Sequence, residues 1–160
     1  MTFAQCTASL YSYLHNESMN VLTHLLPAVY YTGHLLMALL GVGTYAELPS
    51  LETKGFVALS ALSCAYDMWS SAVYHLYNPM GAEESDKLLT YDLVGIVGVT
   101  LGSFLGITYA MFAEWTFERN LIMAIVTPMI LANFAVLLHP SCTSSSRHCC
   151  KISLIATTQV

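Results

Sequence analysis

The sequence predicts an all-α protein, a polytopic helical transmembrane bundle of about four spans. Only 9% of the 160 residues are charged, against roughly 25% in soluble domains, and the mean hydropathy is +0.59. Charged residues are absent from three runs, 18–46, 93–113 and 120–146. A helix needs about 20 mostly apolar residues to cross the hydrocarbon layer. Because these runs have no polar face at helical period, they indicate membrane spans rather than a soluble bundle.

The boundaries of the spans follow from turn-forming and charged residues. The predicted spans cover about residues 20–43, 55–77, 88–113 and 120–139. The first ends in Gly41-Val42-Gly43, a typical helix stop. Residues 1–19 are expected to be a polar lead, and residues 140–160 form a Ser/Thr/Cys-rich tail that is too short and too polar to span. Residues 1–139 are therefore interpreted as one membrane region with a polar tail.

Charge and glycine spacing indicate which partners to expect. The formal net charge of −5, with no cluster of Lys or Arg, argues against nucleic acid, whose phosphates require basic side chains. The lipid bilayer is the predicted partner. The third predicted span carries glycines at spacings of three and four, which favours close helix packing and association with other membrane proteins. These glycines are Gly95, Gly98, Gly102 and Gly106.

Polar residues near the first span share one helix face. Glu17, Asn20 and His24 are spaced by three and four residues. Ionisable groups in a span usually face the protein interior or a functional site, so one interpretation is a polar interior. The other is an ordinary helix start, with Asn16 as the cap and Glu17 in the first turn. The second interpretation does not explain His24, and both stay open at this point.

A second polar group joins the second and third spans. Ser71 and His75 lie one turn apart near the end of one span, and Asp92 lies in the first turn of the next. A short connection makes these spans antiparallel neighbours, so the three side chains can meet at one membrane depth. A histidine with an acid partner is typical of a metal ligand or an acid–base pair. The alternative is a hydrogen bond between helices. Asp67 is expected to make a separate polar contact between helices.

These motifs resemble those of the PAQR family, which includes adiponectin receptors, membrane progestin receptors and bacterial hemolysin III proteins. The stretch 17–26 (ESMNVLTHLL) is similar to the family's first motif. The stretches 71–75 (SAVYH) and 91–96 (YDLVGI) are similar to its second motif, including the serine-to-histidine and histidine-to-aspartate spacings. The resemblance covers about residues 13–139.

The resemblance implies a seven-span membrane receptor linked to zinc and to lipid signalling or metabolism, with a lipid or sterol as ligand. It implies one zinc ligand from the second span, His75, and two from an HxxxH motif in the last span. Ser71 and Asp92 would be the catalytic residues beside the metal. Glu17, Asn20 and His24 would line the cytoplasmic end of the interior. The wider group includes ceramidases, which hydrolyse lipid amides.

The histidines of this sequence depart from that pattern. The six histidines include no pair spaced as HxxxH, whereas a catalytic zinc normally needs three protein ligands. The sequence therefore predicts a protein truncated relative to the seven-span fold, with an incomplete zinc site. Two alternatives follow, an inactive membrane protein that acts by helix association and a small transporter subunit. Residues of the tail, including His148, Cys149 and Cys150, are too closely spaced for a typical zinc site.

Overall fold

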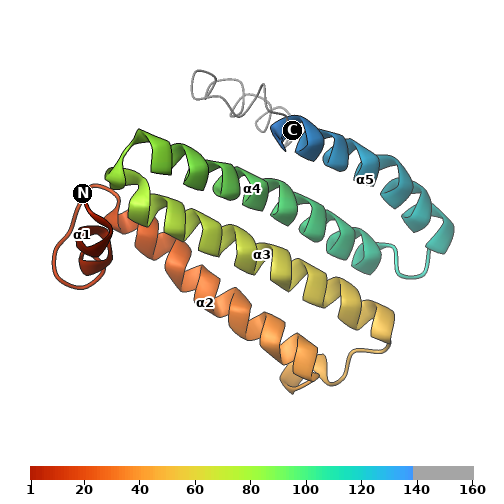
Figure 1. The fold of residues 1–160 in the computed structure, drawn as a ribbon. Helices are drawn as coiled ribbons and strands as arrows, with labels where there is room; N and C mark the ends of the chain where they lie inside the picture. Colours follow the sequence, from red (N-terminus) through yellow and green to blue (C-terminus); the bar gives the residue numbers. More distant parts are fainter. Residues whose placement is uncertain (139–160) are drawn as a thin grey trace.

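The computed structural model describes residues 1–138, and this part of the chain is helical without strands. Four long helices run in alternating directions (Figure 1). Helix α3 lies between α2 and α4, and α5 packs against α4. The predicted all-α bundle is confirmed. The elements are α1 (Phe3–Ala8), α2 (Ser18–Leu40), η1 (Gly43–Tyr45), α3 (Leu51–Tyr77), η2 (Asn78–Met80), α4 (Ala82–Met111) and α5 (Thr116–Leu138).

Three of the four long helices are long and apolar enough to cross a membrane. They are the segments Ser18–Tyr45, Ala82–Met111 and Thr116–Val136. Helix α3 has 27 residues, but its serines, Asp67 and His75 lower its hydropathy. Because α3 lies side by side with α2 and α4 (Figure 1), these polar side chains can face neighbouring helices instead of lipid. The predicted second span, about residues 55–77, lies within α3, which packs between two of these candidate spans.

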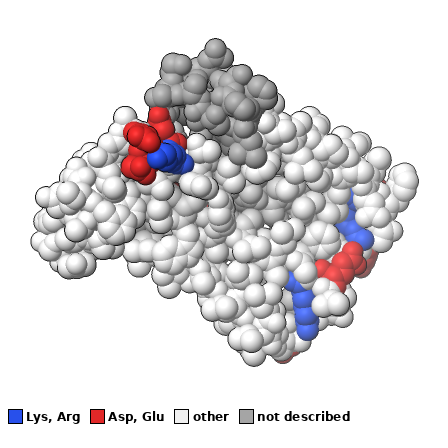
Figure 2. Space-filling model, in the orientation of Figure 1, with Lys and Arg blue, Asp and Glu red and all other residues white. Residues whose placement is uncertain are grey.

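The packing is that of a protein whose outer surface contacts hydrocarbon. Small residues dominate the buried apolar set, which lets helices approach closely. Large apolar side chains lie outside, as expected where lipid replaces water. Figure 2 shows one face, on which charged side chains gather in two groups with a broad uncharged surface between them. Buried alanines are Ala28, Ala38, Ala61, Ala65 and Ala72, and exposed apolar residues include Leu26, Leu39, Leu40, Met111, Ile125 and Met129.

Only the C-terminal end of α2 agrees with the sequence prediction. Gly41 follows the helix with a φ of 63°, the left-handed conformation that glycine adopts without strain. At the other end Glu17 occupies the N-cap position, and its side chain makes no capping bond. The expectation that Asn16 caps the helix is therefore wrong. The Glu17 carboxylate bonds to α3 instead.

The polar lead contains a short helix that the sequence analysis missed. Thr2 and Gln5 form a reciprocal capping box at the start of α1, and the spacing Thr-x-x-Gln is the signal that predicts one. The Phe3 ring stacks on Tyr77 at a centroid distance of 4.7 Å. The terminal ammonium donates a hydrogen bond to the Pro79 carbonyl oxygen at 2.9 Å. These contacts hold α1 against the α3–α4 connection.

Helices α3 and α4 approach closely along the glycine stripe. A methyl group added at Gly95 would lie 2.7 Å from Ser70 Oγ, and one at Gly102 would overlap Ser63. A methyl group at Gly106 would overlap Ser60, whose hydroxyl donates to the Gly102 carbonyl oxygen at 2.9 Å. No atom of the described residues lies within 4 Å of a methyl group built at Gly98. Three of the four glycines therefore pack against α3 of the same chain.

Candidate functional site

The polar residues of α2 and α3 meet at one end of the bundle through the Glu17 carboxylate. Its Oε2 atom accepts a hydrogen bond from His75 Nδ1 at 2.9 Å. The same oxygen accepts a second bond from Asn20 Nδ2 at 2.8 Å. The His75 and Glu17 side chains are 20% and 18% exposed. The pair therefore links two helices at a largely buried position.

This pairing determines the tautomer of the neutral His75 ring. The hydrogen bond from Asn20 lowers the pKa of the Glu17 carboxyl, and the bond from His75 adds to that effect against the opposing effect of burial. Glu17 is then a carboxylate at neutral pH, which can only accept hydrogen bonds. The proton of the neutral imidazole must lie on Nδ1. The free lone pair lies on Nε2, as in histidines that bind metals with a carboxylate behind them.

His24 lies beside His75 and is held in a similar way. The two ring centroids are 5.3 Å apart. His24 Nδ1 lies 2.7 Å from the backbone carbonyl oxygen of Asn20. Because a carbonyl oxygen also only accepts, Nδ1 of His24 carries the proton and Nε2 keeps its lone pair. The interior at this end thus contains two adjacent imidazoles with the same proton arrangement.

Helix α4 brings an acid to the same region. Asp92 and Ser71 are buried, at 9% and 7% exposure, and the Ser71 side chain is a hydrogen-bonding neighbour of the Asp92 carboxyl group. Asp92 also lies within electrostatic range of His75 and His24. Asp67, equally buried, is close enough to interact with Asp92. Buried carboxyl groups cost free energy unless they are paired or hydrogen-bonded, so such placement favours a functional role.

The six predicted site residues therefore come together, but their pairing differs from the one that the spacing suggested. The acid hydrogen-bonded to His75 is Glu17, the N-cap residue of α2, whereas Asp92 has Ser71 as its hydrogen-bonding neighbour. The two groups identified separately in the sequence form one cluster, which we call the polar cluster. Its members are Glu17, Asn20, His24, Ser71, His75 and Asp92.

Among the described residues, the polar cluster does not bring three metal ligands together. Within residues 1–138 no three His, Cys, Asp or Glu side chains are placed to hold a metal ion together. His75 fits the role of a ligand best among the described residues, because its Nδ1 bonds to the Glu17 carboxylate, which supports the ring from behind. The remaining candidate ligands of the sequence, His139, His148, Cys149 and Cys150, lie outside the described residues.

Comparison with protein families gives one match that extends over most of the chain. Residues 12–159 match the family described as haemolysin-III related. The match includes all six residues of the polar cluster and reaches past His139 into the Ser/Thr/Cys-rich tail. No curated protein matches the chain. With its membrane-length helices and this match, the chain is an integral, multi-pass membrane protein that belongs to the haemolysin-III related family.

Proposed function

We propose that the protein is a receptor-like membrane protein in which the polar cluster forms one side of a zinc site linked to lipid metabolism. His75 supplies one ligand through Nε2. Two further histidines, which the family resemblance assigns to an HxxxH motif, come from another polypeptide segment. The observation that carries this proposal is the Glu17–His75 hydrogen bond of 2.9 Å, because it leaves the metal-binding nitrogen of His75 free.

The proposed chemistry of this end is hydrolysis of a lipid amide, the activity of the ceramidases that the family resembles. Asp92 is the residue proposed to accept a proton from the water that would attack the amide carbonyl, because it is buried and Ser71 orients its carboxyl group. A general base must lie within hydrogen-bond reach of the atom that it deprotonates. On the α2 side, His24 lies beside His75, and Asn20 donates to the Glu17 carboxylate that holds His75. A lipid or sterol that enters from the bilayer is the proposed ligand.

Association of the chain with other membrane proteins through the glycine stripe finds less support. Gly95, Gly102 and Gly106 already contact α3, so a partner helix could use only Gly98. A role as a small transporter subunit depends only on the presence of polar residues inside the bundle. Proton-coupled flux in vesicles that contain the purified chain would favour that role over the zinc site.

The test is a complementation experiment. The chain is coexpressed with a membrane segment that carries the HxxxH motif, and the purified complex is assayed for zinc and for fatty acid released from ceramide. We expect about one zinc per complex, a loss of more than about tenfold in His75→Ala, and release of fatty acid only where zinc is bound. The matched control for zinc content is His34→Ala, a histidine of α2 at the opposite end of the bundle. Zinc retained in His75→Ala would overturn the proposed ligand.

A further inference from the structure

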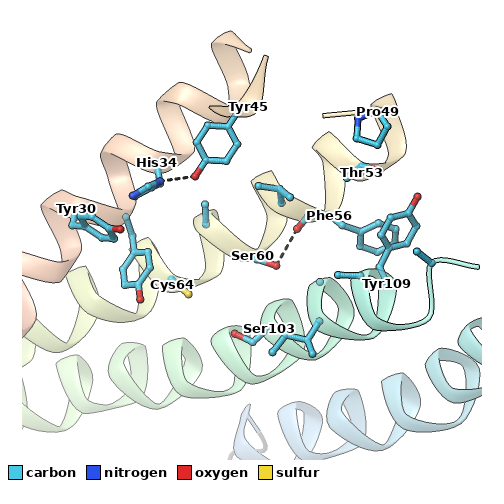
Figure 3. A pocket seen from close by; sticks show the side chains of 17 residues that line it. Tyr30, His34, Tyr45, Pro49, Thr53, Phe56, Ser60, Cys64, Ser103 and Tyr109 are labelled. Carbon is cyan, nitrogen blue, oxygen red and sulfur yellow. Dashed lines mark hydrogen bonds between the residues drawn. The ribbon is translucent and has the colours of Figure 1, made fainter. Parts of the chain in front are cut away.

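A large cavity lies at the end of the bundle opposite to the polar cluster. Its volume is about 540 Å³, and α2, η1, α3 and α4 all contribute to its walls (Figure 3). The volume lies within the range of roughly 300–1,000 Å³ that is typical of small-molecule sites. We call it the tyrosine pocket. Its lining includes Tyr30, Tyr31, Tyr45, Phe56, Cys64 and Tyr109.

The pocket and the polar cluster are separate sites. Phe56 lies near the start of α3, and His75 lies two residues before its end. At a rise of about 1.5 Å per residue, these 19 residues put roughly 28 Å between the two positions along the helix axis. A ligand of the pocket is therefore not a ligand of His75. Binding in the pocket therefore does not depend on the proposed zinc site.

A hydrogen-bonded polar pair lies in this mostly apolar pocket. His34 Nδ1 and the Tyr45 hydroxyl are hydrogen-bonded, and both side chains line the cavity (Figure 3). If tyrosine donates, His34 keeps an Nε2 proton to donate, and the tyrosine oxygen can still accept. If histidine donates, tyrosine keeps its own proton, and Nε2 accepts. In either tautomer the pair offers one donor and one acceptor to a third group.

The position of this pair matches the depth of a lipid head group. Tyr45 lies on η1, just outside α2, and His34 is six residues before the last residue of that helix. The pair is therefore near one boundary of the membrane. From there the pocket extends towards the middle of the bundle, past Ser60 and Cys64 of α3 and Ser103 of α4. Aromatic residues with a polar tip are enriched at this boundary.

The size of the pocket distinguishes between possible occupants. An α-helix with its side chains is about 10 Å across, so 540 Å³ would hold only about 7 Å of its length, little more than one turn. A partner helix is too wide to be the occupant. A lipid is slimmer, is present at high concentration around the spans, and buries its hydrocarbon against apolar walls. Its head group can bond to the His34–Tyr45 pair.

We propose that the tyrosine pocket binds one amphiphile from the bilayer, with a hydroxyl or carboxyl head on the His34–Tyr45 pair and a hydrocarbon body between α2, α3 and α4. The shared chemistry is a small hydrogen-bonding head on an apolar body. Fatty acids and sterols both have it, and the experiment uses one probe of each kind to tell them apart.

The full chain in nanodiscs is labelled with a diazirine fatty acid or a diazirine sterol, and the labelled peptides are mapped by mass spectrometry. We expect one of the probes to label residues of the pocket, and the unlabelled parent lipid to compete. Val57→Trp, which fills the pocket, should reduce this labelling at least about fivefold. The matched control is Leu62→Trp, on the exposed side of the same helix, and it should leave the labelling unchanged.

His34→Phe tests the polar pair separately, because an aromatic ring remains at this position while the hydrogen bond to Tyr45 is lost. It should weaken competition by the parent lipid several-fold. Helix content by circular dichroism and elution as a single species show that each variant is folded. Labelling spread over all lipid-facing residues, or equal in Val57→Trp and Leu62→Trp, would overturn the proposal. Failure of both probes to label the pocket would overturn it as well, without bearing on zinc binding by His75.

Discussion

The two ends of the α2–α3–α4 unit contain similar residue types but organise them in opposite ways. At one end the polar cluster connects Glu17 to both Asn20 and His75 through one carboxylate oxygen. At the other end His34 and Tyr45 form a single pair beside a cavity of about 540 Å³. Hydrogen bonds between side chains connect the helices at the first end, whereas a cavity separates them at the second.

The difference follows from charge. A carboxylate inside a membrane protein costs free energy unless hydrogen bonds stabilise it, so Glu17 draws together the polar groups around it. The tyrosine and phenylalanine side chains of the pocket are uncharged, so burying them does not carry the free-energy cost of a carboxylate. The aromatic rings at this end are therefore not drawn together around a charge, and space remains between them. Histidine therefore has a different environment at each end. His75 has a charged partner that fixes its tautomer, and His34 has a neutral partner that does not.

Membrane topology gives the largest expected effect, because its outcome is all or none. The family resemblance would put the N-terminus in the cytoplasm and residues 44–54 outside, so the polar cluster would lie on the cytoplasmic side and the pocket on the other. Tags at both ends should resist protease in sealed cells, and the Asn16-Glu17-Ser18 sequon should stay without glycan. Digestion of the N-terminal tag alone would show that the orientation or the number of spans is wrong.

The packing of α3 against α4 extends from the polar cluster to the pocket. Substitutions at two glycines of α4 test this packing. Gly102→Ala should destabilise the fold by about 1–3 kcal/mol, because the new methyl group overlaps Ser63. Gly98→Ala is the matched control. Within residues 1–138 nothing lies within 4 Å of its new methyl group, and alanine favours the helix by up to about 1 kcal/mol. Unfolding in detergent, followed by circular dichroism, measures both variants. Equal stability of the two variants would contradict this packing.

The charge behind His75 has a smaller expected effect. In the complemented protein, Glu17→Gln should weaken zinc binding about tenfold, since partners behind a metal-bound histidine typically contribute 10–100-fold and glutamine can still accept the hydrogen bond. Glu52→Gln, at the opposite end of α3, is the control. Competition with a fluorescent chelator measures the affinity. An unchanged affinity would show that Glu17 does not support the ligand.

The smallest effect is a pH dependence of stability. The pKa of Glu17 in the folded protein is lowered below its ordinary value of 4.5, first by the Asn20 hydrogen bond. A carboxyl with a lowered pKa stabilises the fold above its ordinary pKa, and this contribution is lost as pH falls through the lowered value. The stability advantage of the wild-type chain over Glu17→Gln should therefore shrink below about pH 4.5. An advantage that grows on acidification would contradict the assigned hydrogen bonds.

The sequence predicted the helical bundle and the residues of the polar cluster because both follow local patterns. The length of the apolar runs predicted the spans, and spacings of three and four residues predicted that Glu17, Asn20 and His24 share one helix face. The partner of His75 was not predictable in the same way. Glu17 is 58 residues away in the chain, and its pairing depends on how α2 is rotated against α3. Spacing within one helix does not determine that rotation.

The tyrosine pocket was also invisible in the sequence. Its walls come from three helices and η1, and a cavity is a property of how side chains fail to fill space rather than of a motif. His34 and Tyr45 are eleven residues apart, and their contact requires the tight turn that Gly41 permits after α2. Two tyrosines in succession, Tyr30 and Tyr31, were the available signal. They are equally typical of an aromatic belt.

Zinc binding by the isolated 160-residue chain tests the central claim that the polar cluster is only one side of a metal site. The chain is purified in detergent, and bound zinc is counted by mass spectrometry after dialysis against a weak chelator. With His75 as the only assigned ligand, we predict well under one zinc per chain and no measurable ceramide hydrolysis. Stoichiometric zinc that is lost in His75→Ala would contradict the account, because the chain would then complete the site by itself.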